Sequence, residues 1–255
     1  MSGSKPKAEN YKKWLKDRHD VDIDNIIYNN YDSVTLKMKD QFEKSNFWNA
    51  IITDFIKLDQ EYYLKSKGYY LFMDKNYPTI YTKSFDSFLL KTYRKNVLNN
   101  KNWPDEPAGG WILPGNWYLN INDVIRTLFV VKYLDGVDFL VRKLESYSEK
   151  YNLPHEVHLE AREEGYYAAH LYTKLKFEIP NIEWDTEQID ATIEIQVTTQ
   201  LQDVIRRLLH KYYEDNRIKI KGNDNWQWNY KSDEFSANYL GHILHYVAQS
   251  RNLVK

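Results

Sequence analysis

The stretch "ATIEIQVTT", residues 191–199, predicts a β-strand whose two faces differ in polarity. Side chains of a strand alternate between the two faces of its sheet. The apolar side chains fall on one face: Ile193, Ile195 and Val197. The polar side chains fall on the other: Glu194, Gln196 and Thr198. A half-exposed antiparallel strand often shows this pattern, so the stretch alone favours a polar face turned to water.

The composition describes a folded protein of 255 residues, long enough for one large domain or two small ones. Its 22 Tyr and 8 Trp argue against disorder, and a net charge of −1 argues against a general polycation for nucleic acid. The absence of cysteine excludes disulfides and thiolate chemistry. No apolar run is long enough to span a membrane and no signal peptide is evident, so we expect a cytoplasmic protein with no membrane partner.

Hydrophobic periodicity outlines the remaining elements. Helical spacing predicts helices at 8–65, 84–97, 135–153, 201–212 and 232–247. Alternating or continuous apolar patterns predict strands at 123–134, 155–163, 166–179 and 191–199, of which the first reads as buried on both faces. The Pro-, Gly- and Asn-rich segment 99–116 reads as a loop and 216–230 as an irregular connection.

This order of elements predicts an α+β fold with one mixed β-sheet and flanking helices. We expect an N-terminal helical segment at 1–75, a core at 76–215, and a C-terminal connection and helix at 216–255.

Polar side chains of three predicted strands converge if those strands are neighbours. One sheet surface then carries Arg162, Tyr166, His170, Glu194 and Gln196. Ala168 leaves a hollow beside Tyr166 in which a flat ring could stack. An aromatic ring, a guanidinium and a carboxylate on one surface suit the base, phosphate and hydroxyl or metal of a nucleotide.

Four segments, spanning roughly residues 81–212, resemble the motifs of the RelA/SpoT synthetase domain in the family's order. "KSFDSFLLK" resembles its R-x-K-S-x-x-S-[IL]-x-x-K segment, and "INDVIRTLFVVKYLDGVDFL" its D-[IL]-x-G-x-R-[IV] strand. "EEGYYAAHLY" is similar to N-G-Y-R-S-L-H-L, and "IEIQVTTQLQDVIRRLLHKYYE" to E-[IV]-Q-[IV]-R-T followed by a helix. The tail "WQWNYKSDEFSANYLGHILHYV" is similar to small single-domain members. The resemblance implies a nucleotidyltransferase-like fold.

The resemblance also implies a pyrophosphokinase that moves the β,γ-pyrophosphate of ATP onto the 3′-hydroxyl of GDP or GTP, making the alarmones ppGpp and pppGpp. Toxin members of the family instead modify the 3′ end of tRNA. A third hypothesis is a non-catalytic protein that senses nucleotides or binds a partner. The resemblance leaves open an antitoxin or a second copy of the chain as further partners.

The family motifs imply roles for individual residues. Asp123 and Glu194 would hold Mg²⁺, and Glu194 would activate or orient the 3′-hydroxyl. The ATP phosphates would meet residues at the start of one helix: Lys83, Ser84, Ser87, Lys91 and Arg94. Helical spacing places four of these on one face if the helix begins near Lys83. The acceptor would contact Tyr166 by stacking, together with Arg162, His170, Lys174, Gln196 and His210.

Each of these groups also has an ordinary structural interpretation. A basic helix face is commonly solvated, Asp123 could be a loop-end cap, and His170 and Tyr166 could be packed sheet residues. The joint occurrence of the motifs favours the functional interpretation. Retention of both Asp123 and Glu194 argues against the non-catalytic hypothesis.

The sequence departs from the family pattern at four arginine positions. On the donor side, Tyr81 and Leu128 stand where the family has arginine, and Arg126 stands where it has glycine. On the acceptor side, Tyr167 and Thr198 stand where the family has arginine. We expect Tyr81 to stack on the adenine in place of the missing arginine. Loss of cations from an acceptor site suits a tRNA end, which has no free 5′-phosphate chain, better than GDP.

Overall fold

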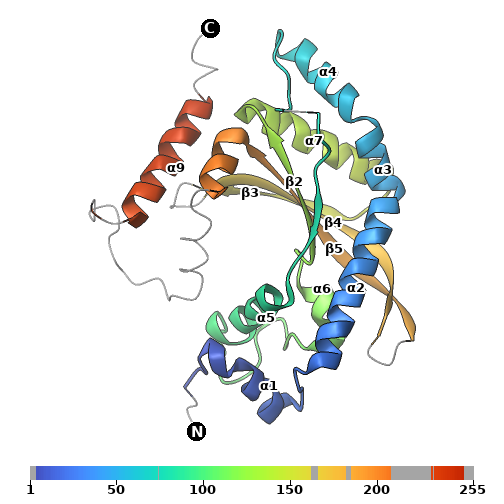
Figure 1. Cartoon of the computed structure of the whole chain (residues 1–255), viewed down its shortest axis with the longest axis vertical. Coiled ribbons are helices and arrows are strands. Elements are labelled where there is room, and N and C mark those ends of the chain that lie inside the picture. Colours follow the sequence, from blue (N-terminus) through green and yellow to red (C-terminus); the bar gives the residue numbers. More distant parts are fainter. Residues whose placement is uncertain are drawn as a thin grey trace. The chain divides into compact units, whose positions relative to one another are not determined.

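The computed structural model describes residues 4–73, 75–161, 166–181, 185–207, 231 and 233–249. Five strands form one sheet in the order β1-β2-β5-β4-β3 (Figure 1). They are β1 (Ile80–Thr82), β2 (Ile125–Val131), β3 (His155–Ala161), β4 (Tyr167–Pro180) and β5 (Thr186–Thr199). A mixed sheet with flanking helices confirms the predicted α+β class.

The chain divides into two compact units that interleave along the sequence. Unit 1 contains residues 1–45, 80–126 and 174–194, and unit 2 contains residues 46–79, 127–173 and 195–255. The division at residues 75 and 215 that the sequence suggested stays a prediction.

Unit 1 contains most of the N-terminal helices. Its elements are η1 (Ala8–Asn10), α1 (Tyr11–His19), α2 (Asn25–Lys44), α5 (Phe85–Tyr93), the π-helical turn η2 (Arg94–Leu98), η3 (Pro114–Asn116) and α6 (Trp117–Asn120). Asp24 caps α2 by accepting hydrogen bonds from the backbone N–H groups of Ile26 and Ile27, at 2.9 and 3.0 Å. α2 contacts β1 and α5, and the fully buried Tyr31 and Phe88 pack together between these helices.

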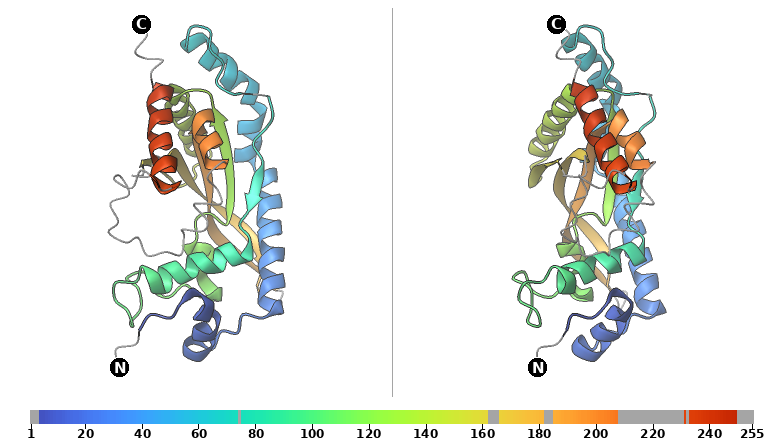
Figure 2. Two further views of the ribbon diagram at one scale, coloured as in Figure 1. Left: turned by 60° about the vertical axis from the view of Figure 1, so that its left-hand side comes forward. Right: turned by 90° about the vertical axis from the view of Figure 1, so that its left-hand side faces the viewer.

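Unit 2 contains α3 (Asn46–Thr53), α4 (Phe55–Lys65), α7 (Leu134–Lys150), a helix at 200–207 and α9 (Asp233–Gln249). The helices α3, α4 and α7 contact one another, and Figure 2 shows α4 continuing the course of α3. Phe55 stacks on Phe72 at a centroid distance of 4.1 Å. In the described part of the chain, no helix has both the length and the hydropathy needed to cross a membrane.

The structure differs from the sequence-based prediction at three elements. Strand 123–134 is not buried on both faces: alternate residues of β2 are buried and the others are half-buried. The three-residue strand β1 and the four-residue helix α6 were not predicted, because both are too short to show a period. The predicted irregular segment 216–230 and the end of the predicted helix 201–212 lie outside the described residues.

The polar face of β5 is largely buried between residues 194 and 198. Glu194 is 5% exposed and Thr198 is 2% exposed, and Gln196 is half-buried. The solvent-facing interpretation of the opening strand is therefore wrong. A buried carboxylate in the middle of a sheet is a costly feature, so it directs attention to the chemistry around it.

Candidate functional site

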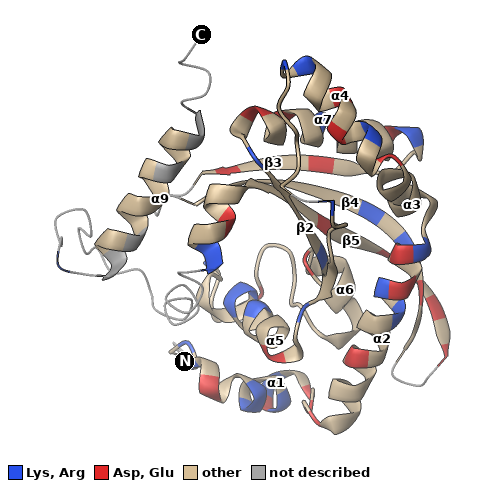
Figure 3. Cartoon of the chain, turned by 45° about the horizontal axis from the view of Figure 1, so that its top comes forward, with Lys and Arg blue, Asp and Glu red and all other residues tan. Residues whose placement is uncertain are grey.

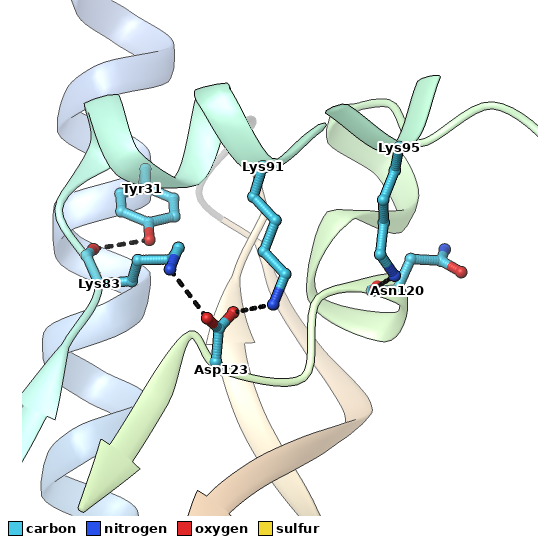
Figure 4. Close-up of polar contacts among 6 residues, drawn as sticks. All are labelled: Tyr31, Lys83, Lys91, Lys95, Asn120 and Asp123. Atoms are coloured by element: carbon cyan, nitrogen blue, oxygen red, sulfur yellow. Dashed lines mark hydrogen bonds and ion pairs between the residues drawn. The ribbon is translucent and has the colours of Figure 1, made fainter. Parts of the chain in front are cut away.

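A carboxylate and two lysines form a buried cluster in unit 1 (Figure 4). Nζ of Lys83 lies 2.8 Å from one carboxylate oxygen of Asp123, and Nζ of Lys91 lies 2.8 Å from the other. Lys83 is 9% exposed and Asp123 is 8% exposed. Three residues that the sequence assigned to donor phosphates and metal are thus brought together.

Short backbone contacts fix the cluster. Lys83 follows β1, and its N–H donates to the carbonyl oxygen of Val124 at 2.9 Å. The hydroxyl of Tyr31 donates to the carbonyl oxygen of Lys83 at 2.8 Å. Lys91 reaches Asp123 from the last turn of α5. Two strand ends and one helix therefore hold the three charged groups in place.

Opposite charges and burial compete at this cluster. Burial by itself would raise the pKa of Asp123, but the nearby Lys91 and Lys83 lower it to about 2. Burial lowers the pKa of Lys83, and Asp123 opposes that shift. The carboxylate stabilises two ammonium groups in a poorly hydrated place, and such groups are well suited to bind a polyanion.

Three more donor-side predictions have separate outcomes. Helix α5 begins at Phe85, so Lys83 precedes the helix and the prediction of a shared helical face is wrong for it. Ser84 occupies the N-cap position, with extended backbone and no side-chain cap hydrogen bond. Tyr81 lies in β1 with its side chain 54% exposed, and its role toward adenine stays a prediction.

A row of rings lines the pairing of β3 with β4 in unit 2. The two strands are antiparallel, and His158 lies directly opposite His170. The ring of Tyr166 lies 6.4 Å from that of His170, and His170 lies 6.2 Å from Tyr172 in a stacked arrangement. Nε2 of His170 lies 3.0 Å from a carboxylate oxygen of Glu160. This surface combines imidazole and phenol rings with one acidic partner.

Both acceptor-side positions that lack the family arginine are engaged in the fold. The ring of Tyr167 stacks on His245 of α9 at 3.4 Å between centroids, and its hydroxyl lies 3.0 Å from Nδ1 of His242. The hydroxyl of Thr198 donates to the carbonyl oxygen of Tyr167 at 2.9 Å. These two positions therefore serve packing around α9.

Of the four remaining acceptor residues, the structure describes two. Arg162 and His210 lie outside the described residues. Lys174 is exposed on β4 and Gln196 is half-buried on β5. The acceptor roles of all four stay predictions.

The chemistry of the carboxylates suits a magnesium ion that is also held by phosphate oxygens. Within the described ranges, no group of three or more His, Asp or Glu side chains is arranged to hold a metal. Mg²⁺ usually takes one or two carboxylates and completes its shell with water and substrate phosphates. Each Asp123 oxygen that meets a lysine keeps a second acceptor position, and the pairing of Asp123 with Glu194 around magnesium stays a prediction.

Searches with the sequence alone identify no relative: no protein-family model matches it, and no curated protein matches it. Among solved structures, the small alarmone synthetase 2 from Bacillus subtilis is similar, with a TM-score of 0.50 and 17% identity over 81% of this chain and 91% of that chain. The chain has the fold of a small alarmone synthetase.

Two further solved structures were compared with this chain. A GTP pyrophosphokinase family protein from Streptococcus pneumoniae has a TM-score of 0.49 and 13% identity, over 96% of this chain and 94% of that one. The small alarmone synthetase 1 from Bacillus subtilis bound to its product pppGpp has a TM-score of 0.49 and 15% identity, over 86% and 98%. At these identities, the likeness to alarmone synthetases concerns the fold alone.

Sequence reasoning missed several residues around the candidate sites. Tyr31 anchors the backbone of Lys83 from α2, far away in sequence. Lys95 donates from η2 to the carbonyl oxygen of Asn120 at 2.9 Å. Glu160 pairs with His170 across the β3–β4 ladder. Only Glu160 had a signal, since it shares a strand face with His158; the other two contacts depend on tertiary packing.

Proposed function

We propose that the chain is a pyrophosphokinase that transfers the β,γ-pyrophosphate of ATP to the 3′-hydroxyl of a guanosine nucleotide. The observation that carries this proposal is the buried cluster of Lys83, Lys91 and Asp123. Phosphoryl transfer needs positioning and charge neutralisation more than covalent catalysis. Two lysines oriented by one carboxylate in a poorly hydrated place supply both, and the small alarmone synthetase fold supports the same activity.

In the proposed reaction, one bond to the β-phosphorus of ATP forms and one breaks. The 3′-oxygen of the acceptor bonds to the β-phosphorus of ATP, and the bond from that phosphorus to the oxygen bridging toward the α-phosphate breaks. AMP leaves with the bridging oxygen. The hydroxyl proton passes to the carboxylate of Glu194. Lys83 and Lys91 neutralise the phosphate oxygens throughout.

Magnesium would be held by Asp123 and Glu194, where it would neutralise charge on the polyphosphate. Burial of Glu194 at 5% exposure keeps bulk water from its carboxylate, which suits a group that receives a proton from a bound alcohol. The guanine base would stack on Tyr166, in the row of rings along β3 and β4.

One observation favours a second candidate, transfer to the 3′ end of tRNA. Tyr167 and Thr198 replace the arginines that the family offers to acceptor phosphates, and both are engaged in packing. They provide no cation for a free 5′-diphosphate. A tRNA end lacks that group, so the loss matters less for it.

The test is transfer of label from ATP carrying ³²P in its β- and γ-phosphates. GDP, GTP and bulk tRNA are offered separately, and we expect label on GDP or GTP with the wild-type chain. Glu194→Gln keeps the shape and removes the charge, so it should abolish transfer; Glu178→Gln, an exposed glutamate of β4, is the matched control.

Three results would contradict the proposal in different ways. Label on tRNA alone favours the second candidate. ATP binding without transfer to any acceptor favours the non-catalytic hypothesis. Full activity of Glu194→Gln removes that residue from the mechanism.

A further inference from the structure

Lys95 lies beside the donor cluster but outside every motif that the sequence offered. It belongs to the π-helical turn η2, which continues α5 directly. Its Nζ donates to the carbonyl oxygen of Asn120, at the end of α6 and three residues before Asp123. Figure 4 shows the side chains of Lys91 and Lys95 extending in the same direction, toward the segment that carries Asn120 and Asp123.

Positive charge accumulates at this place. Partial burial of its side chain lowers the pKa of Lys95, Lys91 lowers it further, and Asp123 acts in the opposite direction. Burial likewise lowers the pKa of Lys83, with smaller contributions in the same direction from Lys91 and Arg126. The ammonium groups of Lys83, Lys91 and Lys95 therefore all interact with the carboxylate of Asp123. Such an excess of charge is unfavourable unless an anion joins it.

The local backbone keeps two like charges close. Lys91 and Lys95 are four residues apart along continuous helix, a spacing at which like charges repel. Single π-helical turns are rare and are frequent at functional sites. Figure 3 shows basic residues along the helical run of α5 and η2, which contains Lys91, Arg94 and Lys95. The repulsion between Lys91 and Lys95 does not stabilise the helix, so a bound anion explains their spacing better.

The three lysines differ in exposure in a graded way. Lys83 is buried, Lys91 has 31% of its side chain exposed, and Lys95 is exposed. A chain of phosphate groups reaching the buried Lys83 would therefore pass cations at successive depths.

We propose that Lys95 is a further binding residue for the donor polyphosphate, in addition to Lys83 and Lys91. This inference rests on the proposed function for the identity of the donor. The competing explanation is that Lys95 only holds the end of α6 through the Asn120 carbonyl. That role needs a hydrogen-bond donor but no charge.

The experiment is calorimetric titration of the full chain with tripolyphosphate and with ATP, for three variants. Lys95→Gln keeps an amide donor for Asn120 and removes the charge. Lys95→Arg keeps the charge, and Lys101→Gln, an exposed lysine of the 99–116 loop, is the control. We expect about a tenfold loss of tripolyphosphate affinity in Lys95→Gln, and a change of less than about threefold in the other two.

Salt gives an independent readout of the charge. The slope of log affinity against log salt should be shallower for Lys95→Gln than for the wild type, because one fewer ion pair forms. A wild-type affinity in Lys95→Gln would overturn the inference, and so would failure of the wild-type chain to bind tripolyphosphate. A loss shared equally by Lys101→Gln would also overturn it, since it would reflect general charge.

The binding experiment tests this inference separately from the proposed function. Tripolyphosphate has no nucleoside and takes part in no transfer, so its binding does not depend on transfer activity. Binding that depends on Lys95 in a chain without transfer activity supports this inference and rejects the proposed function. Transfer activity that survives unchanged in Lys95→Gln, with unchanged tripolyphosphate affinity, rejects this inference alone.

Discussion

The lysine cluster of unit 1 and the row of rings of unit 2 use different physical means. The cluster consists of charges: Lys83 and Lys91 each lie 2.8 Å from Asp123. The row consists of rings: Tyr166, His170 and Tyr172 follow one another at about 6 Å between centroids. Ion pairs in a buried place depend strongly on each partner, whereas ring contacts are individually weak and tolerant of substitution.

This difference matches the two halves of the proposed reaction. A polyphosphate is recognised by charge, and a base is recognised by stacking. Variants that remove a charge should therefore have large effects in the cluster. Variants that remove a ring should have moderate effects in the row.

The largest effect is expected from Asp123→Asn. The change leaves Lys83 and Lys91 facing each other without a carboxylate, so we expect a loss of about 3 kcal/mol in the free energy of unfolding at pH 7. Transfer activity should be lost as well. Urea unfolding measures the stability, and Asp105→Asn, an exposed carboxylate of the same unit, is the control.

The same variant predicts a pH dependence. The pKa of Asp123 is lowered to about 2 in the folded chain, below an unfolded value of about 4. The stabilisation is therefore fully present above pH 4 and is lost as the pH falls through 2. The difference between wild type and Asp123→Asn should shrink over that range. A difference that stays constant down to pH 2 would mean that the ion pairs contribute nothing to stability.

The second largest effect is expected when a charge is placed at Thr198, beside the backbone of Tyr167. Thr198→Arg restores the family residue, but Thr198 is 2% exposed and its hydroxyl is bonded to the backbone of Tyr167. We expect it to lower the free energy of unfolding by at least about 2 kcal/mol and not to improve use of GDP. Thr198→Val keeps the volume and loses one hydrogen bond, so its effect should be near 1 kcal/mol. Improved use of GDP by Thr198→Arg would show that this position faces the acceptor.

The order of motifs was sufficient to predict the fold class and to single out Lys83, Lys91 and Asp123, but not the ion pairs between them. The alternation at residues 191–199 also predicted a strand there correctly, because a strand has a strict period of two.

The sequence could not predict how those faces are covered. The burial of Glu194 and Thr198 depends on segments distant in the chain, and a polar strand face is by default expected to meet water. Tyr167 pairs with His242 and His245, residues 75 or more positions away. Lys95 was overlooked because its role depends on its position in η2 and on its hydrogen bond to the carbonyl oxygen of Asn120. No residue pattern predicts a π-helical turn.

The smallest effect is expected from Tyr166→Ala, and it tests the row of rings directly. Loss of one stacked ring should weaken binding of guanosine or of the tRNA 3′ end about tenfold, since base stacking contributes about 1–3 kcal/mol. Tyr166→Phe retains the ring and should bind within about twofold of wild type. Equilibrium binding of guanosine measures the effect, and Tyr246→Ala, an exposed tyrosine of α9, is the control.

Salt then sharpens the contrast between the two regions. Raising the salt concentration from about 50 to 300 mM screens exposed charges, so it should weaken tripolyphosphate binding and leave guanosine binding nearly unchanged. Guanosine binding that falls as steeply as tripolyphosphate binding would mean that ion pairs, and not rings, hold the acceptor. In that case Tyr166→Ala should have little effect, and Tyr166 would be a packed residue at the start of β4 with no part in recognition.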